Sequence, residues 1–89
     1  MIDNSGKSRF ELTENGLLAF ARYDIENGVR VLTHVEADEG LRGTGAAGRL
    51  MAAIVAAART GGFRLRPVCP YAKAWLARHA DAHDVLAPP

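Results

Sequence analysis

One short segment of the chain combines residue types and spacing that suit chemistry at a phosphate. The segment Gly40–Gly48 reads Gly-Leu-Arg-Gly-Thr-Gly-Ala-Ala-Gly and contains four glycines. It lies between a β-branched run and a run with helical spacing, so we expect a turn from a strand into a helix. Such a turn exposes several backbone N–H groups, and the helix dipole adds partial positive charge there. Because glycines lack a Cβ, a phosphate can approach this backbone closely.

Two well-known phosphate-binding motifs can be compared with this segment. A P-loop requires Lys followed by Ser or Thr after its last glycine, whereas Arg49 and Leu50 follow Gly48 here. The run Gly43–Gly48 does match the G-x-G-x-x-G pattern of dinucleotide-binding folds. Its surroundings do not match, because a predicted meander precedes it and no second βαβ half follows. We therefore expect a phosphate site that belongs to neither class.

Cys69 is the only cysteine, and it stands in the segment Pro67-Val68-Cys69-Pro70-Tyr71. It follows a predicted strand and precedes a proline that suits the first position of a helix, where the helix dipole favours a thiolate. A thiolate there could accept an acyl group or take the proton of an amine. The alternative is a small buried hydrophobe that lines a pocket without doing chemistry.

Three histidines and one glutamate are further candidates. His34 and Glu36 are two residues apart on a predicted strand and should share a face. Either could act as a proton acceptor for an attacking nucleophile; the alternative is a solvated charge pair. His79 and His83 are four residues apart on the last predicted helix, a spacing that can hold a metal ion. No third ligand is evident, so we expect both to be solvated and predict no metal site.

Periodicity and turn signals predict an antiparallel meander that positions His34 and Glu36. Asn15-Gly16 and Asn27-Gly28 are hairpin signals, because both residue types tolerate positive φ. They separate strands predicted at about residues 9–13, 17–24 and 29–36. One face of the third strand should carry Val29, Val31, Thr33 and Val35, and the other Arg30, Leu32, His34 and Glu36.

The second half of the chain predicts a strand–helix–strand unit. A helix from about 44 to 60 should end at Gly61-Gly62, and a fourth strand over about 63–68 should lie parallel to the third. A short second helix should begin at Pro70. The predicted fold class is α/β (α+β), with about four mostly antiparallel strands, one main helix and a short C-terminal helix. The apolar stripe of the main helix comprises Ala47, Leu50, Met51, Ile54, Val55 and Ala58.

The pattern Arg42-x-x-Gly45-x-Ala47 after a strand resembles motif A of the GCN5-related N-acetyltransferases, the GNAT superfamily, which grips the pyrophosphate of acetyl-CoA. His34–Asp38, Leu41–Gly43 and Pro67–Tyr71 are similar to the short, single-domain, YjdJ-like branch, which reads roughly H-T-E-V-P-x-x-L-R-G-x-G and then P-x-C-x-Y. The resemblance runs from Phe10 to about Val85. The departures are Val35 for the usual Thr, Ala37-Asp38 for Val-Pro, and Ala47 where many members carry Gly.

This resemblance implies an acetyl-CoA-dependent N-acetyltransferase that acts on an unidentified amine, either a small amine or a protein lysine or N-terminus. The pantetheine arm should pair with strand residues 34–37, and the thioester should lie where the third and fourth strands splay apart. The expected catalytic residues are Cys69, Glu36 and His34. The expected cofactor-binding residues are Val35, Ala37, Arg42, Gly43, Thr44, Gly45, Ala46, Ala47, Gly48 and Tyr71, with the pyrophosphate on the amides of Gly43, Gly45, Ala46 and Ala47.

Two other functions stay open at this point. One is a non-catalytic CoA-binding sensor or interaction module, which would need neither Cys69 nor Glu36. The other is a small interaction domain without a CoA site. The chain has few residues left to wall an acceptor site, so a second subunit in a homodimer could supply that wall.

Composition limits the remaining choices. The chain has 89 residues with a net charge of +1, which suits one domain and does not suit a dedicated nucleic-acid binder. One cysteine excludes an internal disulfide. We expect no membrane partner, because no apolar run approaches the roughly 18 residues of a spanning helix. A cytoplasmic location, a flexible tail over residues 1–6 and a single domain over 7–87 complete the expectations.

Overall fold

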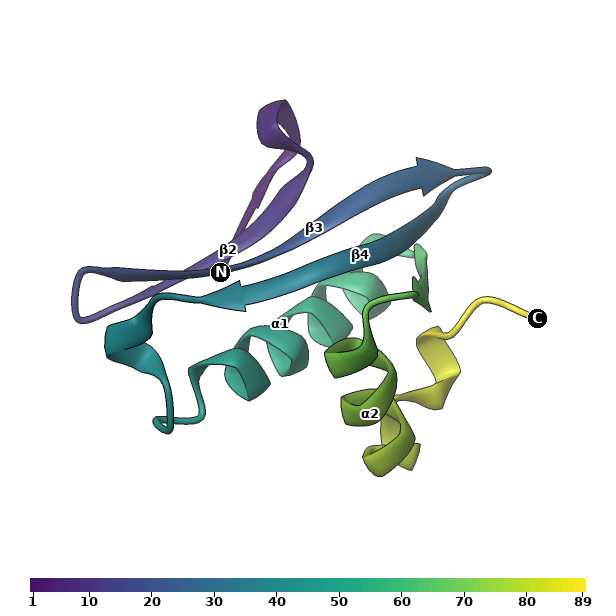
Figure 1. The fold of residues 1–89 in the computed structure, drawn as a ribbon. Helices are drawn as coiled ribbons and strands as arrows, with labels where there is room; N and C mark the ends of the chain where they lie inside the picture. Colours follow the sequence, from purple (N-terminus) through teal and green to yellow (C-terminus); the bar gives the residue numbers. More distant parts are fainter.

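The computed structural model, which describes residues 1–89, has two layers: a twisted sheet and two helices on one face of it (Figure 1). The strand order follows the chain, β1-β2-β3-β4-β5. This confirms the predicted mixed α/β class, with five strands instead of about four. The strands are β1 (Ile2–Asn4), β2 (Arg9–Glu14), β3 (Leu17–Glu26), β4 (Val29–Ala37) and β5 (Arg64–Pro67). The helices are α1 (Ala46–Gly61) and α2 (Pro70–Arg78), and the short 3-10 turns are η1 (Ser5–Lys7), η2 (Glu39–Leu41) and η3 (Ala80–Val85).

Both Asn-Gly hairpins form where the sequence predicts them. Asn15 and Gly16 have φ values of 52° and 73°, and Asn27 and Gly28 have φ values of 52° and 79°. Two consecutive residues with positive φ give a turn whose twist matches that of the strands on either side. The meander β2-β3-β4 is therefore antiparallel throughout, as expected.

The first strand is a correction to the predicted tail over residues 1–6. Ile2–Asn4 forms β1 and pairs antiparallel with β2, so this part of the chain belongs to the sheet. The Tyr23 hydroxyl donates a 2.6 Å hydrogen bond to Asp3, and Arg30 lies 3.8 Å from the same carboxylate. These partners are distant in sequence, which is why the polar N-terminal pattern gave no sign of the strand.

A β-bulge in β4 overturns the predicted assignment of side chains to faces. Arg22 pairs with His34 whereas Tyr23 pairs with Leu32, so Thr33 is an extra residue in β4. Leu32 is fully buried in the core, and beyond the bulge Val35, not His34, packs against that core. An extra residue inverts the alternation of every side chain that follows it. His34 consequently lies on the uncovered face of the sheet.

Helix α1 supplies most of the helical half of the core. Its buried residues match the predicted stripe except that Ala46 is buried and Ala47 is only half-buried. Gly62, with φ of 71°, ends the helix in the predicted C-cap position. Strand β5 then pairs parallel to β4, as expected. No helix in the chain is both long and apolar enough to cross a membrane.

Ionisation of Tyr23 is predicted to make the stability of the fold depend on pH. Burial of the phenol, and secondarily its hydrogen bond to the Asp3 carboxylate, raises the pKa of Tyr23 above its usual range. The folded protein thus holds this proton more tightly than the unfolded chain does. The resulting contribution of Tyr23 to the free energy of unfolding is fully present below about pH 10 and is lost as the pH rises through the folded-state pKa.

Urea unfolding of the wild type and of Tyr23→Phe at about pH 8 and about pH 10.5 tests this coupling. The free energy of unfolding of the variant should be about 1 kcal/mol lower at about pH 8, because the hydrogen bond to Asp3 is gone. Its further decrease between about pH 8 and about pH 10.5 should be smaller than that of the wild type. Tyr71→Phe is the control, since the Tyr71 ring is exposed. Equal alkaline losses in all three proteins would contradict the assignment.

Candidate functional site

Strand β4 extends beyond its neighbour β5, and its last residues therefore have a free edge. Pairing of the two strands ends at Leu32 and Pro67. The Leu32 carbonyl accepts the N–H groups of Val68 at 2.9 Å and Cys69 at 3.0 Å, and α2 begins at the next residue. The chain after β5 thus turns away from β4 and leaves residues 33–37 unpaired on that side.

The hydrogen-bond pattern of β3 and β4 determines which backbone groups face this free edge. Asp38 N–H donates to the Leu18 carbonyl at 2.8 Å, so in the same register His34 and Glu36 bond to β3. The alternate residues Val35 and Ala37 direct their N–H and C=O groups outward, toward the free edge. These two residues were predicted to bind the pantetheine arm, and the backbone can accept an extended chain there.

The glycine-rich turn brings unpaired backbone N–H groups to the start of α1. Gly43 and Gly45 have φ values of 77° and 87°, which favour glycine. Ala46 N–H donates to the Thr44 hydroxyl at 3.3 Å, so this amide, expected to hold pyrophosphate, already has a partner. The amides without an acceptor in the protein are those of Gly43, Gly45, Ala47 and Gly48.

The two arginines near this turn have different roles. Arg49 makes two hydrogen bonds to the Glu14 carboxylate, at 2.8 and 2.7 Å, and a third to the Thr44 carbonyl at 3.0 Å. The hydrogen bonds with Arg49 lower the pKa of Glu14. Arg42 is exposed, makes no ion pair and borders the cavities beside the turn. Arg42 is therefore the arginine beside this turn whose charge has no partner in the protein.

Two adjoining cavities connect the free edge of β4 with the start of α1. The first, of about 350 Å³, is called the slot here and is lined by Val35, Glu36, Ala37, Arg42, Ala47 and Tyr71. The second, of about 290 Å³, is bordered by the glycine-rich turn and shares Ala37, Arg42, Ala47 and Tyr71 with the slot. Eight of the predicted cofactor-binding residues border the second cavity: Ala37, Arg42, Gly43, Gly45, Ala46, Ala47, Gly48 and Tyr71.

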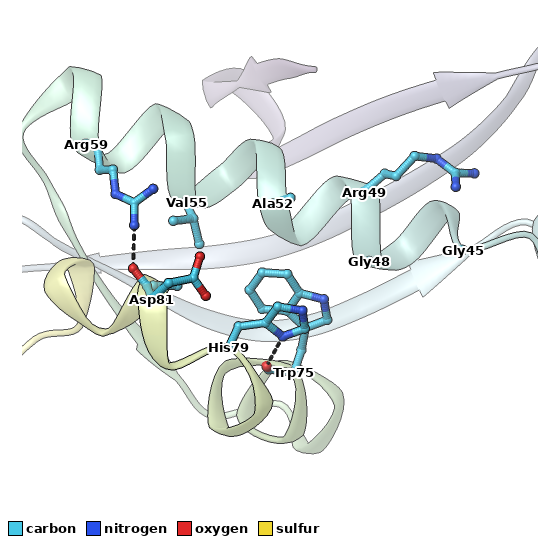
Figure 2. A pocket seen from close by; sticks show the side chains of 10 residues that line it. Gly45, Gly48, Arg49, Ala52, Val55, Arg59, Trp75, His79 and Asp81 are labelled. Carbon is cyan, nitrogen blue, oxygen red and sulfur yellow. Dashed lines mark hydrogen bonds between the residues drawn. The ribbon is translucent and has the colours of Figure 1, made fainter.

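A groove of about 410 Å³ continues from the turn between α1 and the C-terminal elements (Figure 2). It shares Gly45 and Gly48 with the cavity beside the turn. Its other wall carries Trp75 and His79, whose rings stack with centroids 3.7 Å apart. Arg59 lies at the far end, where it donates to the Asp81 carbonyl at 2.7 Å. The sequence analysis did not anticipate this groove, because its walls come from segments distant in the chain.

The predicted catalytic residues are divided between the slot and the core. Glu36 borders the slot, and its carboxylate lies 3.3 Å from His34 Nε2, with both side chains more than half exposed. Cys69 is 7% exposed and belongs to the hydrophobic core. None of the cavities in the chain is lined by the Cys69 side chain. The geometry thus brings Glu36 and His34 together and places Cys69 apart from them.

The sequence predicted that His79 and His83 are solvated, but each makes a hydrogen bond within the protein. His79 Nδ1 lies 2.6 Å from the Trp75 carbonyl, and His83 Nε2 lies 2.8 Å from the Leu76 carbonyl. A carbonyl only accepts hydrogen bonds, so these nitrogens carry the protons. The two histidines therefore donate to carbonyls near the end of α2, and the Leu76 carbonyl also accepts the backbone N–H of His79 at 3.2 Å.

Similarity to known proteins points to one family. The family model described as GCN5-related N-acetyl-transferase matches residues 9–85. The chain is also similar to the solution NMR structure of a GCN5-like protein from Staphylococcus aureus, with a TM-score of 0.63 and 20% identity over 89% of this chain and 88% of that one. No curated protein sequence matches the chain.

The two glycines at the start of α1 are predicted to respond in opposite ways to alanine. Gly45→Ala should lose about 1–2 kcal/mol of stability, because φ of 87° is strained for an L-residue and the new Cβ would lie 3.0 Å from Arg49. Gly48→Ala should gain about 0.5–1 kcal/mol, because glycine disfavours a helix. The added Cβ at Gly48 meets only ordinary contacts, at 3.5 Å from Trp75 and 3.9 Å from Tyr71. Urea unfolding measures both effects, and a loss for Gly48→Ala would contradict this prediction.

Proposed function

The chain belongs to the GCN5-related N-acetyltransferase family, and on that premise we propose that it binds acetyl-CoA and transfers the acetyl group to an amine. The observation that carries the proposal is the junction of two unpaired backbone surfaces. Free N–H groups at the start of α1 lie beside the free edge of β4, and one pair of adjoining cavities borders both. A diphosphate joined to an extended amide-bearing arm suits these two surfaces.

The residues fit the parts of acetyl-CoA in order along these cavities. The amides of Gly43, Gly45, Ala47 and Gly48, with Arg42, would hold the pyrophosphate, because N–H groups at a helix start favour anions. Val35 and Ala37 would pair with the amides of the pantetheine arm as an added strand does. Tyr71 would line the arm from the α2 side. The groove that continues past Gly45 and Gly48 would take the nucleotide end (Figure 2).

Acetyl-CoA supplies an activated thioester, and the protein must remove a proton from the ammonium group of the acceptor. Glu36 is the proposed proton acceptor, because this residue of β4 borders the slot and its side chain is exposed to solvent. His34, at 3.3 Å from that carboxylate, would orient it or share the proton. Cys69 is proposed to have a packing role after the end of β5, since it belongs to the hydrophobic core. Direct attack of the amine on the thioester then requires no acetylated protein intermediate.

A binding module without catalysis is the second candidate, and one observation favours it. The uncovered face of the sheet provides no enclosed acceptor pocket, because all the cavities border the helices or the glycine-rich turn. A protein that only senses CoA would keep the slot and the free N–H groups at the start of α1, and it would need no acceptor site. Acetyl-CoA binding without turnover of any amine would support this candidate.

Substitution of Gly48 is predicted to test the cofactor site without disturbing the fold. A glutamate in the first turn of α1 is favourable for the helix, but its charge would lie beside the free amides. In Gly48→Gln the bulk is the same and the charge is absent. A saturable rise in melting temperature with acetyl-CoA is expected for the wild type, because the ligand binds only the folded state. Calorimetric titration should give at least roughly a tenfold weaker Kd for Gly48→Glu than for Gly48→Gln.

Dephospho-CoA and ATP are the ligand controls for this titration. A response selective for CoA compounds would support the site. No shift of the wild type at millimolar acetyl-CoA, or affinities of both variants equal to that of the wild type, would argue against pyrophosphate binding at the start of α1.

Glu36 and Cys69 are predicted to differ in their effects on turnover. Glu36→Gln should lower kcat by about 100-fold at neutral pH, because the amine loses its proton acceptor. Cys69→Ala should lower kcat by less than about tenfold and also reduce stability by about 1 kcal/mol, because it removes a buried sulfur. Acetyl-CoA consumption with a panel of amines measures both. Loss of turnover in Cys69→Ala with an active Glu36→Gln variant would instead assign the chemistry to the thiol.

A further inference from the structure

The sheet face opposite the helices is uncovered (Figure 1). It carries the exposed side chain of Glu36, the proposed proton acceptor. Both helices pack on the other face. Because of the bulge at Thr33, His34 and Glu36 project from the uncovered face, where their side chains are 53% and 58% exposed. An amine that reaches Glu36 therefore approaches from this side, and whatever else lies on the face can contact the acceptor.

Two residues of β3 stand directly opposite this pair. Arg22 is the cross-strand partner of His34, and Phe20 is the partner of Glu36. The Phe20 ring has its centroid 6.1 Å from that of His34, and the guanidinium of Arg22 lies 5.7 Å from the centroid of Phe20. We call these four residues, Phe20, Arg22, His34 and Glu36, the open-face cluster.

Arg22 is one of the arginines of the chain whose charge has no ion-pair partner. Its side chain makes no hydrogen bond and no ion pair. The neighbouring Arg9, whose guanidinium is 4.8 Å from the Phe20 ring, is paired with Glu11. Arg22 is therefore a cation without an ion pair on the strand next to Glu36, whose carboxylate has His34 Nε2 as its neighbour at 3.3 Å. Such a pair of opposite charges is complementary to a ligand that carries an ammonium and a carboxylate side by side.

The shape of this face favours a macromolecular acceptor. None of the cavities is lined by Phe20, Arg22 or His34. Small-molecule sites are concave and enclose most of their ligand, whereas a polypeptide segment can lie across a flat surface. A flat patch with one aromatic ring between charged groups suits a short segment of chain.

We propose, building on the function proposed above, that the acceptor is a polypeptide amine with an acidic residue next to it in the sequence. Glu36 attracts the ammonium and takes its proton, Arg22 binds the neighbouring carboxylate, and Phe20 contacts the aliphatic stem. In the transfer, the C–N bond of the new amide forms as the C–S bond of the thioester breaks, CoA leaves as the thiolate, and the second proton that the nitrogen loses passes to the CoA sulfur. A segment rich in lysine and arginine is disfavoured, because the uncompensated charge of Arg22 repels it.

The experiment compares two short peptides that differ at one residue, each with a blocked N-terminus and a single lysine. One peptide has Asp beside the lysine and the other has Asn. The wild type should acetylate the Asp peptide with a kcat/KM higher by about fivefold at low salt, in keeping with an exposed charge pair, and less so as salt is added. Arg22→Gln should bring the ratio to about one, and Arg22→Lys should retain part of it.

Arg78→Gln is the matched control, because Arg78 is an exposed cation without an ion pair on α2. It makes the same change of net charge and should keep the wild-type peptide preference. The KM for acetyl-CoA should be unchanged in every variant. Amide chemical shifts recorded during a titration with the Asp peptide should move at Phe20, Arg22 and His34 in the wild type.

Several results would overturn the inference. Equal turnover of both peptides, a preference that survives Arg22→Gln, or shifts elsewhere on the surface would each do so. Turnover of small amines but of no peptide, or a dimer formed through the open-face cluster in sedimentation, would also overturn it. In these cases acetyl-CoA binding to the same sample leaves the proposed function intact. Absence of that binding would instead reject the proposed function itself, and the acceptor inference with it.

Discussion

The arrangement of the site depends on a single carbonyl. Leu32 C=O accepts hydrogen bonds from both Val68 and Cys69, and in doing so it ends the pairing of β4 with β5. Thr33, the next residue, is the extra residue of the bulge. The end of pairing with β5 and the bulge therefore occur at the same point of β4. Beyond this point β4 has a free edge, and its side chains alternate in the opposite sense. A continuous β4–β5 ladder would leave no free edge, and an unbulged β4 would direct Glu36 toward the helices.

The small core explains why the polar groups of the site are all accessible. Twenty of the 89 residues are buried, and no polar or charged residue is among them. A domain of this size has little hydrophobic stabilisation to offset the cost of burying a charge. The charged groups consequently lie at edges and faces, where water satisfies them. The sheet, covered on one side only, separates a face that holds cavities from a face that holds free charges.

Features encoded by neighbouring residues could be predicted from the sequence, whereas features that depend on distant partners could not. Asn15-Gly16 and Asn27-Gly28 require positive φ locally, so both hairpins were predictable. The bulge depends on how β3 and β4 align, which the alternation in β4 alone does not reveal. The engagement of Arg49 with Glu14 joins residues 35 positions apart, and it leaves Arg42 as the arginine beside the glycine-rich turn without an ion pair.

The structure distinguishes glycines of the turn that the fold itself requires from a glycine that it does not require. Gly40 has a folding reason, because a Cβ there would lie 2.6 Å from the Leu17 side chain. Gly43 and Gly45 have another, because both have positive φ. Gly48 has neither: its backbone is helical, and a Cβ would meet only ordinary contacts. Glycine at that position disfavours the helix. Since Gly48 also borders two of the cavities and contributes an unpaired N–H, the close approach of a ligand to the backbone accounts for it best.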